Sequence, residues 1–215
     1  FNQDRGIVTV CKLLVGNLVD RRVDITKIQA EMEQELEDHG LVGFCEANVV
    51  PDFETGVLDI AQASGVGALR PNTIMFGWSR RVERLASQLR IMAATSRAGK
   101  STIIARLAWA HEPGQEKRID VWWGGLRGNG ALMQILAYLI RTSLKWRGAE
   151  FRLKMVVPDE AAAREVRGNL DAFLDRSRTG AVAEVLASEG RAFDDILHES
   201  SADADLVMLG MAQPG

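Results

Sequence analysis

The chain has 215 residues, of which 47% are hydrophobic and 26% charged, with 20 Gly and five Pro. This composition excludes disordered and collagen-like proteins, and the length suits one large domain or two small ones. The 26 Lys and Arg against 29 Asp and Glu give a net charge of −3, which argues against a dedicated binder of nucleic acid or anionic membranes. The longest apolar stretch, Leu132–Ile140, is far shorter than the roughly 20 residues of a membrane span. We therefore expect a soluble chain, and its start at Phe1 suggests a fragment of a larger protein.

The first half of the chain predicts alternating strands and helices. A run that is apolar on both faces, Gly6–Val15, is typical of a buried central strand. Ile25, Ile28, Met32 and Leu36 form one helical stripe after Asp24, a suitable N-cap. The further elements expected here are a strand at Phe44–Val50, a helix at Phe53–Ala63, a strand at Thr73–Trp78, a helix at Arg81–Ala94 and a strand at Thr102–Ala108.

The second half continues the same alternation. Its expected strands are Ile119–Trp123, Phe151–Val157, Val182–Ala187 and Leu206–Leu209, and its expected helices are Ala131–Lys145, Glu160–Arg176 and Arg191–Ser200. Such alternation predicts an α/β fold with a mostly parallel sheet flanked by helices. Pro71–Gly77 and Asp203–Gly210 are both apolar strands with a polar start and a closing glycine. This echo suggests two related βα halves, residues 1–110 and 111–215.

The cysteines and histidines give no sign of a metal site. Cys11 and Cys45 both lie in apolar runs without C-x-x-C spacing, which predicts buried structural thiols of a reducing compartment. The three histidines are far apart in sequence and none is near a cysteine. Zinc and other His/Cys sites are therefore not expected.

One segment resembles a phosphate-binding P-loop, but its context is reversed. Ala94–Ser101 (ATSRAGKS) ends in Gly-Lys-Ser, yet a helix is predicted before it and a strand after it. A P-loop needs a strand before it and a helix after it. Asp120 also opens its strand, whereas a Mg²⁺-binding aspartate would close one. We therefore expect a helix-to-strand turn in which Gly99 caps the helix.

A second glycine-rich segment has the right context for anion binding. Gly124–Gly130 (GGLRGNG) lies between a predicted strand and a predicted helix, whose N-terminus presents unpaired N–H groups. Its spacing is not G-x-G-x-x-G, so a structural turn is the favoured interpretation. Two alternatives remain, namely a segment that contacts a phosphate or nucleotide and a loop that binds a partner. The candidate positions are Gly128, Asn129 and Gly130, with ATP or another nucleotide as the ligand. No catalytic constellation is recognisable, so an enzyme is not expected.

Five segments together resemble the cytoplasmic C-terminal domain of the cation-chloride cotransporters, the family of Na-K-Cl and K-Cl symporters. They are Gln62–Gly77 (QASGVGALRPNTIMFG), Ile119–Trp123 (IDVWW), Asn129–Trp146, Glu150–Val157 and Glu199–Gly210. The first pattern is the most specific. The short connection between Thr102–Ala108 and IDVWW looks prokaryotic, because animal members carry a long insertion there.

The resemblance implies a fold similar to tandem universal stress proteins and a non-catalytic role in homodimerisation and transport regulation. It also implies a transmembrane transport domain covalently attached to the N-terminus and a location on the cytoplasmic side of the membrane. Nucleotide has been associated with this region in some members. The alternative is a stand-alone, nucleotide-binding protein of the universal-stress type, which would rest on the strand, glycine-rich loop and helix geometry at Gly124–Ala131. An ATPase that uses Lys100 is a third, weaker hypothesis.

Overall fold

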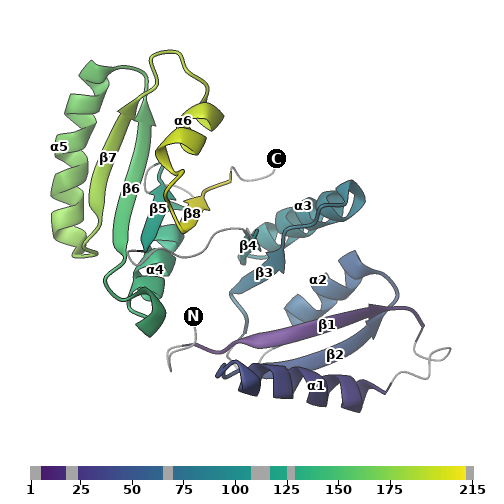
Figure 1. Cartoon of the computed structure of the whole chain (residues 1–215). Coiled ribbons are helices and arrows are strands. Elements are labelled where there is room, and N and C mark those ends of the chain that lie inside the picture. Colours follow the sequence, from purple (N-terminus) through teal and green to yellow (C-terminus); the bar gives the residue numbers. More distant parts are fainter. Residues whose placement is uncertain (1–5, 18–23, 65–69, 108–116, 125–128, 212–215) are drawn as a thin grey trace. The chain divides into compact units, whose positions relative to one another are not determined.

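The computed structural model describes residues 6–17, 24–64, 70–107, 117–124 and 129–211 of the chain. The chain divides into two compact units between Ala108 and Trp109 (Figure 1). We call residues 2–108 the N-terminal unit and residues 109–212 the C-terminal unit. Each is described by itself.

The N-terminal unit alternates strands and helices in its described residues. Its elements are β1 (Thr9–Val15), α1 (Ile25–Asp38), β2 (Phe44–Val50), α2 (Phe53–Ala63), β3 (Thr73–Gly77), α3 (Val82–Arg97) and β4 (Ser101–Ala105). The strands form two separate parallel pairs, β1 with β2 and β3 with β4. These elements confirm the α/β class that the sequence predicts.

Side-chain caps fix where the first two helices begin. The Asp24 carboxylate accepts a hydrogen bond from the backbone N–H of Lys27, and Asp52 caps α2 in the same way through Thr55. The hydrogen bond to Thr55 is also the main reason why the pKa of Asp52 lies below its ordinary value. Helix α1 ends at Asp38, and Gly40 two residues later has a φ of 63°, a conformation that suits glycine.

Strand β1 differs from the prediction of a buried central strand. It begins at Thr9, three residues later than expected, and Val10 and Val15 are 37% and 50% exposed. The reason is that β1 pairs with β2 alone among the described strands, so one edge and part of its surface are uncovered. Cys11 is exposed as well, which corrects the prediction that both cysteines are buried; Cys45 on β2 is buried.

The C-terminal unit forms one parallel sheet of four strands in the order β7-β6-β5-β8. Its elements are β5 (Arg118–Trp122), α4 (Gly130–Arg141), a 3₁₀ turn (Leu144–Trp146), β6 (Glu150–Val157), α5 (Glu160–Ser177), β7 (Val182–Ala187), α6 (Phe193–Ser200) and β8 (Leu206–Leu209). Helix α4 ends four residues before the predicted Lys145. Thr142 and extended Ser143 interrupt the helix there, and the short turn follows.

The two faces of this sheet differ in chemistry. On one face, Ile119 and Val121 of β5 are fully buried, and α4 and α5 contribute Ala137 and Leu170 to the same apolar core. Because side chains alternate along a strand, the residues between them point to the other face. There Trp122 packs edge-on against Phe193 of α6, with ring centroids 5.3 Å apart. That second face carries the polar residues described next.

Candidate functional site

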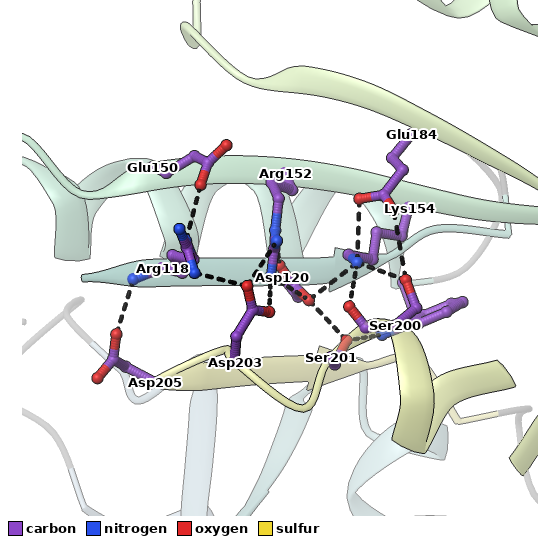
Figure 2. A network of polar contacts seen from close by, with 11 residues as sticks. Arg118, Asp120, Glu150, Arg152, Lys154, Glu184, Ser200, Ser201, Asp203 and Asp205 are labelled. Atoms are coloured by element: carbon purple, nitrogen blue, oxygen red, sulfur yellow. Dashed lines mark hydrogen bonds and ion pairs between the residues drawn. The ribbon is translucent and has the colours of Figure 1, made fainter. Parts of the chain in front are cut away.

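A buried carboxylate, Asp120, lies at the centre of a polar network on the α6 face of the sheet (Figure 2). Arg152 on the neighbouring strand β6 donates two hydrogen bonds to it, at 2.6 and 3.0 Å. The hydroxyl of Ser201 donates a third at 2.6 Å, and this hydroxyl accepts one from the indole N–H of Trp122 at 3.0 Å. The carboxylate is thus fully desolvated but compensated by charge and by hydrogen bonds.

Lys154 supplies a second buried charge beside Asp120. Its ammonium group is 0% exposed and lies 3.4 Å from the Asp120 carboxylate and 3.0 Å from that of Glu184 on β7. It also donates to the carbonyl oxygen of Ser200 at 2.5 Å and to the Ser200 hydroxyl at 2.6 Å. Two carboxylates and two serine oxygens therefore surround this cation.

The network extends to the sheet edge through Asp203, in the segment between α6 and β8. Its carboxylate accepts hydrogen bonds from Arg152 at 2.8 Å and from Arg118 at 2.6 Å. Arg118 also pairs with Glu150 at 3.0 Å, and its backbone N–H donates to Asp205 at 2.8 Å. Figure 2 shows that residues from β5, β6, β7 and the α6–β8 segment meet here.

The electrostatics of the network favour the charged forms of two members, Arg152 and Asp203. Burial lowers the pKa of Arg152, but the hydrogen bonds that its guanidinium donates to Asp203 and Asp120 outweigh this effect and raise the pKa above its ordinary value. The hydrogen bond from Arg152 is likewise the main reason why the pKa of Asp203 lies below its usual value. Arg152 and Asp203 therefore form a stable ion pair.

Chemically, this network is suited to holding the segment Ser200–Asp205 against the sheet. A serine nucleophile would need a neutral base to take its proton. Lys154 instead lies between two carboxylates and donates to Ser200. The sequence analysis did not predict the network. The sequence feature that could have indicated it is the presence of charged residues inside strands that are otherwise apolar. These are Asp120 in RIDVW and Arg152 and Lys154 in EFRLKMVV.

The predicted anion loop lies only partly within the described residues. Gly128 is outside them, while Asn129 precedes α4 and Gly130 is its buried first residue. The Asn129 side chain donates to the carbonyl oxygen of Met211, just after β8, at 2.9 Å. These residues lie at the carboxyl ends of β5 and β8, where the strand order reverses, and such points are common ligand sites in parallel sheets. Phosphate binding there stays a prediction.

The P-loop-like segment is a helix-to-strand turn, as predicted. Gly99 has a φ of 72°, and its N–H donates to Ser96 while that of Lys100 donates to the carbonyl oxygen of Thr95. This pair of bonds is the Schellman motif that ends many helices. The Lys100 ammonium donates to the carbonyl oxygen of Pro71 at 2.5 Å. Lys100 therefore ties the start of β3 to the end of α3.

Neither thiol nor metal chemistry finds support in the described part of the chain. No group of three or more His, Cys, Asp or Glu residues there could hold a metal ion. Partial burial, followed by the nearby Glu46 carboxylate, raises the pKa of Cys11 to about 11, so its thiolate is scarce at neutral pH. Burial also raises the pKa of Cys45.

A comparison with protein families connects the N-terminal unit to a known group. Residues 2–89 match the family model SLC12, solute carrier family 12. The match runs from before β1 to the middle of α3 and supports a relationship to the cation-chloride cotransporters. It includes Gln62–Gly77, the segment on which the sequence resemblance mainly rests. In the described residues, no helix is long and apolar enough to cross a membrane.

Proposed function

We propose that this chain is a non-catalytic, cytosolic regulatory and dimerisation domain of a secondary-active cation-chloride cotransporter. The observation that carries the proposal is the match of residues 2–89 to the solute carrier family 12 model. Segments of the C-terminal unit, among them IDVWW and Glu199–Gly210, add to it because they resemble the same family in the same order. On this proposal, the transport domain lies N-terminal to the chain and holds the ion-binding residues.

The polar network supports a structural role for the C-terminal unit. Its buried charges, Asp120 and Lys154, have several partners each, and these partners come from four parts of the fold. A network in which both buried charges are paired favours one arrangement of the α6–β8 segment. Such a rigid unit suits a domain that transmits force or position to an attached partner.

Exposed apolar side chains support the dimerisation part. Ile135 and Tyr138 lie three residues apart on α4 and are 57% and 42% exposed, and Leu144 just beyond is 76% exposed. Residues spaced three apart share one helix face. Apolar groups that gather on a surface often mark interaction sites, and a second copy of this chain is the partner proposed here.

The experiment is a transport assay on the full-length protein that carries this chain. Reconstituted into vesicles, it should take up rubidium ions in a chloride-dependent manner. Deleting residues 1–215 should change the maximal rate of rubidium uptake. The ion concentrations that give half-maximal uptake should stay the same, because the ion sites lie elsewhere. No chloride-dependent uptake by the full-length protein, or a gene without membrane-spanning segments, would contradict the proposal.

The alternative is a stand-alone nucleotide-binding protein of the universal-stress type. One observation favours it, namely the position of Asn129 and Gly130 at the reversal of strand order. However, the Asn129 amide is already bonded to the chain after β8. A calorimetric titration with ATP distinguishes the two functions, since only the alternative requires the chain to bind ATP.

A further inference from the structure

Cations gather at the end of the C-terminal unit where its strands begin. The ends of α4 and α5 and the starts of β6 and β7 lie together there, at the lower end of this unit in Figure 1. Residues 141–149 (RTSLKWRGA) contain three cations and no acidic residue, and residues 175–182 (DRSRTGAV) contain two cations and one acidic residue. We call these two segments, together with Lys117 at the start of β5, the basic rim.

Hydrogen bonds of Arg141 join the two segments of the basic rim. Its guanidinium at the end of α4 donates to the carbonyl oxygens of Thr179 and Gly180, just before β7, at 3.0 and 3.2 Å. The ammonium group of Lys117 lies 4.8 Å from the centre of the Trp146 ring. The cations therefore belong to one connected surface, although they are far apart in the sequence.

The charges of the basic rim are open to solvent and uncompensated. Lys145, Arg147 and Arg178 are all exposed. Within the described part of the chain, no carboxylate forms an ion pair with any of the three. The nearby Glu150 pairs with Arg118 instead, at 3.0 Å. The rim therefore presents positive charge that attracts an anionic surface.

An exposed apolar side chain stands among these cations. Leu144 begins the short 3₁₀ turn after α4 and is 76% exposed. Trp146 ends the turn and is partly buried against the core of the unit. Lys145 and Arg147 alternate with these two residues along the chain. Leucine and tryptophan flanked by cations are typical of segments that bind the headgroup region of anionic membranes. A nucleic acid would use the cations alone and would leave the leucine without a partner.

The net charge of the chain, −3, acts on such a contact only weakly. At physiological salt the Debye length is about 8 Å, so an anionic surface responds mainly to the charges next to it and more distant charges are screened. The exposed, unpaired charges next to Leu144 are those of Lys145 and Arg147, both positive. The overall charge therefore argues against a dedicated membrane binder, but it leaves room for a local contact.

We propose that the basic rim binds the surface of anionic phospholipid membranes. Leu144 enters the headgroup region, and Lys145 and Arg147 contact the lipid phosphates. This assigns Leu144 to the membrane, while Ile135 and Tyr138 on α4 stay assigned to the contact between two copies. The inference rests on the surface of this chain and does not depend on the proposed transport function.

Cosedimentation of the chain with lipid vesicles is the first test. At about 0.1 M salt, we expect the partition coefficient to be at least about tenfold higher for vesicles with about 30% phosphatidylserine than for vesicles of phosphatidylcholine alone. Binding to the anionic vesicles should fall severalfold at about 0.5 M salt, because salt screens the attraction. Equal binding to both kinds of vesicle, or no binding to either, would overturn the proposal.

A matched pair of charge reversals locates the contact. Lys145→Glu should lower the partition coefficient on anionic vesicles at least about tenfold. Arg164→Glu changes the net charge equally, but Arg164 lies near the start of α5, which follows the carboxyl end of β6 at the opposite end of the unit. It should leave vesicle binding almost unchanged. Both side chains are exposed, so both variants should fold, which circular dichroism checks. Equal losses in the two variants would contradict a contact through the rim.

A second pair of variants distinguishes a membrane from a soluble polyanion. Leu144→Gln keeps every charge and should weaken binding to anionic vesicles about fivefold, while retention on heparin stays the same. Ile135→Gln removes an exposed apolar side chain from the middle of α4 and should change neither. If Leu144→Gln left vesicle binding unchanged while Lys145→Glu abolished retention on heparin, the rim would be a general polyanion site and the membrane proposal would be wrong.

Discussion

At the scale of single residues, the C-terminal unit depends on a few buried charges. Asp120 and Lys154 are 0% exposed, and each has partners on a neighbouring strand and in the α6–β8 segment. Burying such groups is costly, and removing one partner leaves the others unpaired in a medium of low polarity. Asp120 contacts two cations, so its loss has the largest expected effect.

Replacing Asp120 by alanine should therefore destabilise the protein strongly. We expect the free energy of unfolding in urea to fall by about 3–5 kcal/mol. The matched control is Glu150→Ala, which removes an ion pair with Arg118 from an exposed position and should cost about 1 kcal/mol or less. Equal losses in the two variants would show that the network does not hold the unit together.

Asp203 makes the stability of the protein depend on pH. Its hydrogen bond from Arg152, followed by the charges of Arg152 and Arg118, lowers its pKa in the folded state. The stabilisation is then complete above the unfolded pKa of about 3.9 and disappears as the pH falls through the lower, folded value. The difference in unfolding free energy between wild type and Asp203→Asn should be constant above about pH 5 and shrink below about pH 4. A difference that stays constant down to pH 2 would contradict this origin.

At the scale of elements, a glycine that caps a helix and a glycine inside a helix should respond differently to replacement by alanine. Gly99 ends α3 with a positive φ of 72°, whereas Gly168 lies within α5 with no atom within 4 Å of an added Cβ. Gly99→Ala should destabilise the protein by about 1 kcal/mol, because alanine is strained at positive φ. Gly168→Ala should stabilise it by roughly 0.5–1 kcal/mol. Thermal unfolding measures both, and changes of the same sign would be inconsistent with these assignments.

The order and type of the elements could be predicted from sequence because their local signals are strong. The N-cap residue Asp24 begins α1, and Phe44–Val50, Phe53–Ala63 and Val182–Ala187 have the predicted bounds. The exposure of β1 could not be predicted, because it depends on which strands pair, and apolar periodicity carries no such information. Asp120, Arg152 and Lys154 come together through strand pairing and the α6–β8 segment. The contacts of the network join residues up to 87 positions apart, Arg118 and Asp205, so no local pattern specified these partners.

At the scale of the whole molecule, the proposed dimerisation requires that two copies associate through exposed apolar surfaces. Ile135 on α4 is 57% exposed and belongs to the face proposed for this contact. Ile135→Glu should weaken dimerisation at least about tenfold, since a charge would be desolvated at the contact. Val82→Glu, at a 76% exposed position that begins α3, is the matched control and should leave association unchanged.

Analytical ultracentrifugation of this chain over a wide concentration range, with and without ATP, tests the proposed dimerisation directly. We expect a reversible dimer whose dissociation constant is the same in both conditions and rises with Ile135→Glu. A chain that stays monomeric at high concentration, or that dimerises only when ATP is present, would contradict it. The second result would favour a nucleotide-binding protein, with Asn129 and Gly130 as the first residues to replace.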